Sequence, residues 1–235
     1  FVAFQNFNRD TRVKSQYLVV RSNNGGATWS QPVKAAEVHD GFTKYPVCEG
    51  SQVLDDMCAR VNGAGNIDVD PRNGDLYLTW SDNRNGTAED TNTDVFVKKS
   101  VDGGRSWQMM ARKFTIKSND DQWFPWLSVA PNGTVAVTYF DRRYGNGKFI
   151  DTSLSQSVRG GRAFDTKRVS EVSWNPDLAF RLGVFIGDYN GLDTTATTAL
   201  PFWTDARFAE PNVRGNNPPR QQSDVMVDVE KLRQR

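Results

Sequence analysis

Histidine is almost absent from this chain, because His39 is the only one among 235 residues. A single imidazole excludes a multi-histidine metal centre, and it excludes a Ser-His-Asp triad anywhere away from that position. The sequence also lacks a glycine-rich phosphate loop of the nucleotide-binding type. The acidic stretch SDNRNGTAEDTNTD offers oxygen ligands for calcium but lacks the EF-hand spacing, and solvation explains it better. We therefore expect neither a metal ion nor a cofactor.

An excess of one charge sign is also missing, because 29 Lys and Arg residues face 28 Asp and Glu residues, giving a net charge of +1. Nucleic acid and anionic membrane surfaces are therefore not indicated as partners. No apolar run approaches the roughly 18 residues of a membrane-spanning helix. The opening FVAFQNFNRD resembles a strand rather than a signal peptide. There is no long amphipathic helix pattern, so an all-β chain is expected.

Cysteine is scarce, with Cys48 and Cys58 alone in the segment YPVCEGSQVLDDMCAR. They are either unrelated free thiols or a local disulfide that closes a long loop. Two Asn-Gly-Thr sequons, at Asn85 and Asn132, fall in predicted exposed turns and are candidate glycosylation sites. Together, the cysteine pair and the sequons favour a secreted, extracellular protein.

A short turn-like motif recurs along the chain. It reads SVDGGRSW at 100–107, SNNGGATW at 22–29 and, in a weaker copy, SVRGGRAF at 157–164. Short β-rich runs, DVFVKK and QYLVVR, precede the first two copies. The longer unit NIDVDPRNGDLYLTWSDNR, two strands joined by a turn, recurs as WFPWLSVAPNGTVAVTYFDRR and more loosely near the end of the chain. Repeats at fixed offsets indicate an array architecture.

Each repeat reads as four strands, the second of which ends in an aromatic-x-Asp-x-Arg element. The aromatic residues Trp80, Tyr139 and Trp203 lie 59 and 64 residues apart, and the interval from Phe4 to Trp80 is longer, at 76, because the cysteine loop is inserted there. Four-stranded units in series describe a β-propeller, in which each blade buries its faces against its neighbours. A β-sandwich would not explain the repeat. Residues 1–235 are thus predicted to form a single β-propeller domain.

SVDGGRSW satisfies the Ser-x-Asp-x-Gly-x-(Ser/Thr)-Trp pattern of the Asp-box, or BNR repeat, and the chain resembles the sialidase-like propellers that carry it. The resemblance implies six or seven blades of four antiparallel strands in the complete fold. We expect about three and a half to four blades in this chain, with an N-terminally incomplete start, and a self-contained four-bladed ring as the alternative. In that family the Asp-box joins the third and fourth strands, away from the active face. A structural role is expected for its residues Ser22, Asn24, Gly26, Trp29, Ser100, Asp102, Gly104 and Trp107.

The opposite face carries Arg84, Arg143 and Arg207 at equivalent positions in three blades. In sialidases, an arginine triad clamps the substrate carboxylate through bidentate bonds, and the resemblance suggests the same role here. The alternative is structural, because equivalent positions in a repeat usually do the same job. Each arginine would then pair with the aspartate two residues before it, or with the aspartate that starts the next strand.

The resemblance also implies a tyrosine nucleophile with a glutamate base and an aspartic acid/base. Tyr189 stands where sialidases place that tyrosine, although it could be an ordinary inner-strand aromatic, and no glutamate is well placed beside it. Asp121 is the candidate acid/base, and the candidate substrate-binding residues are Asp120, Trp123 and Arg181. A solvated loop is the alternative for this segment. The Arg-Ile-Pro element of sialidases is absent.

The sequence thus predicts a secreted protein whose partner is a glycan or glycoconjugate. An enzyme is favoured, a sialidase-like glycoside hydrolase of the exo-α-sialidase type. Two alternatives remain, a non-catalytic carbohydrate-binding or protein-interaction propeller and a propeller polysaccharide lyase, because a fold does not fix a function.

Overall fold

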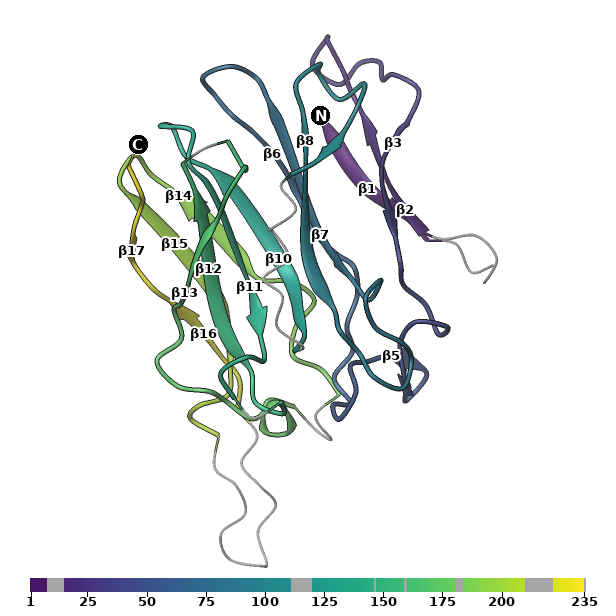
Figure 1. Ribbon diagram of the computed structural model, residues 1–235, viewed down its shortest axis with the longest axis vertical. Helices are drawn as coiled ribbons and strands as arrows, with labels where there is room; N and C mark the ends of the chain where they lie inside the picture. Colours follow the sequence, from purple (N-terminus) through teal and green to yellow (C-terminus); the bar gives the residue numbers. More distant parts are fainter. Residues whose placement is uncertain are drawn as a thin grey trace, which may run out of the picture.

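The computed structural model describes residues 1–7, 15–110, 120–145, 147–158, 160–180, 184–209 and 222–234. In these residues the chain forms antiparallel β-sheets that lie side by side, with one short 3-10 helix, η1 (Pro176–Leu178) (Figure 1). In the described part of the chain, no helix has the length and apolar character needed to cross a membrane.

Four sheets follow one another along the sequence. The first contains three strands, β1 (Val2–Asn6), β2 (Ser15–Val20) and β3 (Val33–Val38). The second contains β6 (Ile67–Val69), β7 (Leu76–Asp82), β8 (Asp94–Ser100) and β9 (Gln108–Met109). The third contains β10 (Gln122–Val129), β11 (Val135–Asp141), β12 (Asp151–Ser157) and β13 (Asp165–Arg168). The fourth contains β14 (Gly191–Thr194), β15 (Thr198–Asp205), β16 (Asp224–Val227) and β17 (Glu230–Lys231).

The sheets are the blades of a β-propeller, as the repeat predicted. In the second and third sheets, each strand pairs with the next one along the chain, so that four sequential strands complete a blade. In the fourth sheet, β16 and β17 both pair with β15, so together they occupy the position of a third strand. The strands β6, β10 and β14 open their blades, and β10 contacts both of the others. These three are therefore the innermost strands.

Apolar side chains fill the spaces between neighbouring blades. One cluster, which includes Tyr17, Val38, Trp80 and Phe96, joins the first and second sheets. A second joins the second and third sheets through residues such as Tyr77, Val97, Leu127 and Tyr139. The largest joins the third and fourth sheets and includes Trp123, Phe140, Trp174 and Trp203. Every residue of the middle strands β7 and β11 is buried, because both faces of these strands are covered by adjacent blades.

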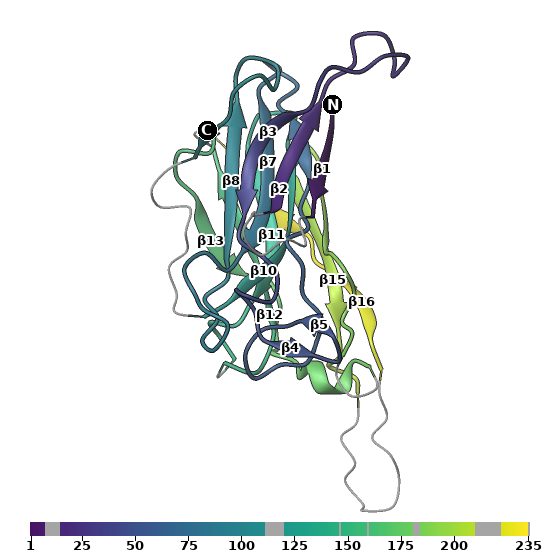
Figure 2. The same ribbon diagram turned by 90° about the vertical axis from the view of Figure 1, so that its right-hand side faces the viewer.

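The loops and turns that connect the strands lie at two opposite ends of the molecule. The turns at 22–29 and 100–107 and the described residues of the third copy lie at the end near the N and C labels of Figure 1, which we call the turn end. The loops that follow β7 and β11, the η1 helix and the hairpin of β4 (Val47–Cys48) and β5 (Ser51–Gln52) lie at the opposite end, which we call the loop end (Figures 1 and 2). A site at the loop end is thus built from loops of several blades.

Candidate functional site

Hydrogen bonds within the SVDGGRSW turn occupy its polar side chains. The Ser100 hydroxyl donates to Asp102 Oδ1 at 2.8 Å and accepts from the amide of Gly104 at 2.9 Å. Asp102 also accepts from the hydroxyl and the amide of Ser106, and these bonds lower the pKa of its carboxyl. Gly103 and Gly104 both have positive φ, of 69° and 82°, which favours glycine there. This geometry fits a structural turn rather than a catalytic acid.

The first copy of the motif repeats these bonds with an amide in place of the carboxylate. The Ser22 hydroxyl donates to Asn24 Oδ1 and accepts from the amide of Gly26, both at 2.9 Å. Asn24 Oδ1 also accepts from the amide of Thr28. The two tryptophans differ, because Trp107 is half-buried and donates to Gly104 O, whereas Trp29 is 48% exposed.

The three equivalent arginines pair with aspartates of their own blades. Arg84 Nε and Nη2 donate to Asp82 at 2.8 and 2.7 Å. Arg207 binds Asp205 in the same manner, and Arg143 binds Asp141. All three aspartates are fully buried. This pairing is the structural alternative that the repeated positions suggested. A guanidinium that turned toward a substrate would leave a buried carboxylate without its cation.

In two blades, the aromatic residue of the aromatic-x-Asp-x-Arg element is a tryptophan that also bonds the aspartate. The indole of Trp80 donates to Asp82 Oδ2 at 3.0 Å, and that of Trp203 donates to Asp205 Oδ2 at 3.3 Å. In the third blade Tyr139 bonds Ser155 instead, and the Ser153 hydroxyl donates to Asp141. The repeated element is therefore a buried hydrogen-bond unit that closes the end of each middle strand.

Asp121 lies beneath the surface at the loop end. It accepts hydrogen bonds from the Thr93 amide, the Thr91 hydroxyl and Arg142 Nη1, each at 2.8 Å. It is 2% exposed, and burial raises the pKa of its carboxyl. The prediction that Asp121 is the acid/base is therefore wrong, because a carboxyl enclosed by these partners does not reach a sugar that approaches from solvent. Sequence reasoning missed Arg142, which also binds Asp55 at 3.0 Å.

A bulge in the innermost strand β10 separates its two tryptophans. The register with β11 shifts between Trp123 and Trp126, and Phe124 between them has a φ of 50°. Trp123 is fully buried in the core, whereas Trp126 is half-buried at the surface. The prediction that Trp123 binds substrate is therefore wrong, because its side chain is enclosed in the core. The side chain of Asn190 holds the bulge by donating to the carbonyl of Phe124 at 3.1 Å.

Contacts link five residues from three separate segments, and we call them the loop-end cluster: Arg60, Trp126, Phe185, Asp188 and Tyr189. Tyr189 is 65% exposed, and its ring centroid lies 5.8 Å from that of Trp126. Asp188 forms an ion pair with Arg60. The Arg60 guanidinium lies 5.4 Å from the Phe185 ring centroid. Among the described residues, no carboxylate forms a hydrogen bond with the Tyr189 hydroxyl. The cluster thus offers an exposed aromatic platform next to a carboxylate.

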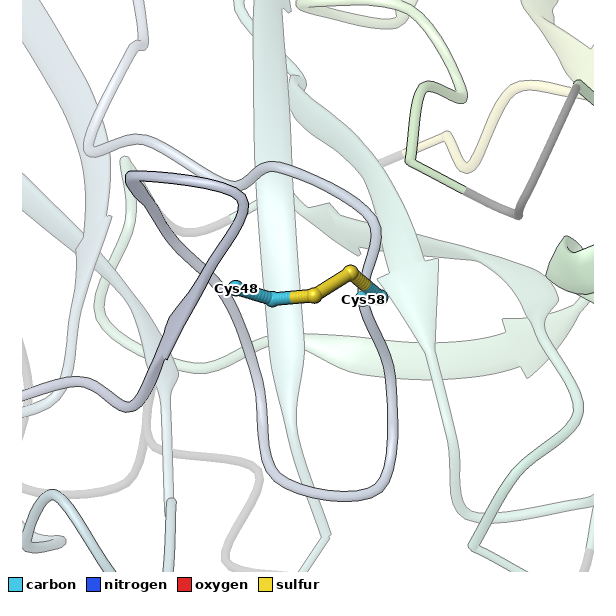
Figure 3. The surroundings of a disulfide bond; sticks show 2 residues. All are labelled: Cys48 and Cys58. Carbon is cyan, nitrogen blue, oxygen red and sulfur yellow. A yellow bond between two sulfur atoms is a disulfide. The ribbon is translucent and has the colours of Figure 1, made fainter.

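The disulfide predicted as one alternative is present between Cys48 and Cys58, with their Cα atoms 5.5 Å apart (Figure 3). It closes the inserted loop just before Arg60. Arg60 pairs with Val53 across this loop, and its amide donates to Val184 O at 3.1 Å. The disulfide loop therefore supplies the cation of the cluster. Arg60 has no counterpart in the other repeats, so the sequence carried no signal for it.

None of the remaining predicted residues is among the five residues of the cluster, and one of them lies outside the described residues. Asp120 is half-buried immediately before β10, and Arg181 lies outside the described residues. The side-chain amide of Asn85 donates to the Asp94 carboxylate, and the side-chain amide of Asn132 donates to Gln234 Oε1 at 3.3 Å. Within the described chain, no three His, Cys, Asp or Glu side chains form a group that could hold a metal ion.

The sequence matches no protein-family model and no curated protein. Among solved structures, the chain is similar to the α-L-arabinofuranosidase Arb93A of Fusarium graminearum, bound to an iminosugar inhibitor. The TM-score is 0.53 with 13% identity, covering 97% of this chain and 58% of that one.

Two further structures are similar at lower scores. A mutant of Arb93A gives 0.49 with 16% identity, covering 70% of this chain and 44% of that one. A protein of unknown function from Dyadobacter fermentans gives 0.43 with 13% identity, covering 93% and 64%. The chain thus spans less than two thirds of the length of each structure. At these identities the likeness shows the fold alone.

Proposed function

We propose that the protein is a secreted glycoside hydrolase that seats a sugar on the loop-end cluster. The observation that carries the proposal is the contact between the exposed Tyr189 and the half-buried Trp126, beside the Asp188–Arg60 ion pair. Aromatic faces stack on sugar rings, and charged side chains beside them orient hydroxyl groups. The arabinofuranosidase with the same fold supports a glycan substrate. The disulfide supports secretion, since such bonds persist in oxidising compartments.

Hydrolysis of a glycosidic bond requires two carboxyl groups, one as an acid and one as a base or nucleophile. Asp188 precedes β14, Asp120 precedes β10, and these two innermost strands contact each other. We assign the base or nucleophile to Asp188, because Arg60 holds it as an ion pair. Asp120 is assigned as the acid. Tyr189 and Trp126 form the surface on which the sugar lies.

A sialidase-type mechanism is the finer version of this proposal and would use Tyr189 as the nucleophile. The exposed position of Tyr189 and the Asp-box resemblance of the turns support it. The pairing of the three arginines with buried aspartates argues against it, because their guanidinium groups are already engaged. A carboxylate pair is therefore the version that the geometry favours.

The test is an assay with fluorogenic arabinofuranosides and sialosides on purified wild type and variants. Asp188→Asn and Asp120→Asn should each lower kcat/KM by about 100-fold or more. Glu171→Gln is the matched control, because this loop-end carboxylate is 89% exposed and lies outside the cluster. Tyr189→Phe should keep most of the activity, since the ring remains and only the hydroxyl is lost.

The outcomes separate the versions of the proposal. If Tyr189→Phe is the only variant that loses sialoside cleavage, the tyrosine mechanism is established. Binding of glycans by calorimetry without any product would identify a non-catalytic glycan-binding propeller. Equal hydrolysis by wild type and Asp188→Asn would remove the loop-end cluster from the chemistry.

A further inference from the structure

The turn end of the molecule contains a groove between the first two copies of the repeated turn. Its cavity volume is about 470 Å³, which lies within the usual range for a small-molecule site. The lining includes Arg21, Thr28, Trp29, Ser30, Gly103 and Arg105. We call this the turn-end groove. Its lining comes from β2, β3 and the turns at 22–29 and 100–107.

Two guanidinium groups converge on one point of this groove. A Cβ atom placed on Gly103 would lie 2.9 Å from Arg21 Nη1 and 3.7 Å from Arg105 Nη1. The two cations come from different blades, and the absence of a side chain at Gly103 makes room for them. In the described part of the chain, neither arginine forms an ion pair with a carboxylate. Like charges this close repel each other, so an anion bound between them would be stabilised by both.

The arginines are oriented by bonds that leave other donors available. Arg21 Nε donates to Asn23 Oδ1 at 2.7 Å, and Arg105 Nη1 donates to the carbonyl of Asp102 at 2.7 Å. The Asp102 carboxylate accepts its hydrogen bonds from within its own turn, from the hydroxyl groups of Ser100 and Ser106 and from the backbone amides of Arg105 and Ser106. Internal hydrogen bonds fix both turns, so the groove is formed before a ligand arrives.

Trp29 gives the groove a second kind of contact. Its side chain is 48% exposed, whereas Trp107 at the same position of the next turn is half-buried. An exposed indole beside two cations suits a ligand that combines a ring face with a negative charge. Acidic sugars have this combination, because a pyranose ring carries a carboxylate or a sulfate ester.

The equivalent groove between the second and third turns lacks these features. Its described lining residues include Lys99, Met110 and Arg162, and none of those described is aromatic. Lys99 forms an ion pair with Asp75 at 2.5 Å, so its charge is already neutralised. The two grooves are built on the same repeat, and they differ in the residues that would recognise an acidic sugar.

We propose that the turn-end groove is a binding site for acidic saccharides, with Arg21 and Arg105 holding the anionic group and Trp29 stacking on the ring. The site goes beyond the proposed hydrolase function, because it shares no residue with the loop-end cluster. It would hold a charged glycan chain on the protein independently of any cleavage at the other end.

The test measures binding of three oligosaccharides of equal length by calorimetry in low salt: an oligogalacturonate, a heparin fragment and neutral maltohexaose. We expect the acidic ligands to bind and the neutral one not to bind. Arg21→Gln and Arg105→Gln should each weaken binding about tenfold or more, because each removes a charge-assisted contact. A preference for one acidic ligand would distinguish a carboxylate site from a sulfate site.

Arg162→Gln is the matched control, since Arg162 occupies the position of Arg105 in the third turn. It should bind the acidic ligands as wild type does. Trp29→Ala should weaken binding of the saccharides but not of inorganic sulfate. Asp188→Asn should leave this binding unchanged, which separates the groove from the proposed active site. Equal binding of maltohexaose, or unchanged binding by the Arg21→Gln/Arg105→Gln double variant, would overturn the proposal.

Discussion

At the residue scale, Asp102 and Asn24 occupy the same position in two copies of one turn, and only Asp102 titrates. The hydrogen bonds from Ser106 and Ser100 lower the pKa of Asp102 in the folded protein. The unfolded chain therefore takes up this proton first as the pH falls. The stability from this group is complete above the ordinary aspartate pKa of about 4, and it is lost as the pH falls toward the folded-state pKa.

We expect the free energy of unfolding of Asp102→Asn to decrease less than that of wild type as the pH falls. The variant keeps an Oδ1 acceptor, as Asn24 does in the first turn, but it has no carboxyl to protonate. Urea unfolding between about pH 5 and pH 2.5 would show a smaller loss of unfolding free energy in the variant than in wild type. Parallel curves for the two proteins would mean that the Asp102 pKa does not change on folding.

A second residue-scale prediction concerns Asp121 and its buried partner Arg142. The Arg142 side chain is 5% exposed, so Asp121→Asn would leave a buried guanidinium with only the half-buried Asp55 to balance it. We expect a loss of about 3 kcal/mol in the free energy of unfolding, measured with urea at neutral pH. Asp120→Asn, one residue earlier and half-buried, should cost less than 1 kcal/mol as the control. Similar losses in both variants would contradict the buried network.

At the scale of elements, the disulfide loop connects stability to the position of Arg60. Its cysteines are separated by 10 positions, and closing a loop of this size stabilises a fold by about 3 kcal/mol. The Cys48→Ala/Cys58→Ala double variant should lose about this much, measured by urea unfolding. It should also weaken glycan binding at the loop-end cluster. Reducing the disulfide of the wild type should reproduce both effects. The double variant is the control, because a reductant that changes its stability or binding would be acting at a group other than this disulfide.

The elements also show where sequence reasoning succeeds and where it stops. Strand order and blade identity could be predicted, because hydrophobic alternation and turn residues are local signals that repeat. The bulge between Trp123 and Trp126 could not, since it is held by Asn190 from another blade. Arg60 could not be predicted either, because its partner Asp188 is 128 residues away. Sites assembled from several loops lie beyond what a local pattern reveals.

At the scale of the whole molecule, side-chain bonds join the innermost strands of different blades. Asn66 donates to the carbonyl of Leu127 at 2.8 Å and accepts from its amide at 2.7 Å, so one side chain pairs both backbone groups of the neighbouring blade. Asp68 accepts from the amide of Val129 at 2.8 Å in the same interface. These bonds take the place of a β-ladder between blades, where two sheets meet without pairing.

Asn66→Ala should therefore weaken the contact between the second and third blades rather than a local turn. It would leave the amide and the carbonyl of Leu127 without partners in a buried environment, at a cost of about 2 to 3 kcal/mol of unfolding free energy. Asn73→Ala is the matched control, because the Asn73 side chain bonds only Asp75 within its own exposed turn. It should cost less than about 1 kcal/mol. Urea unfolding measures both, and amide exchange at Leu127 should rise in the Asn66 variant alone, since its protection depends on a bond from another blade. Equal losses in the two variants would mean that the blades are held by their apolar clusters without help from these bonds.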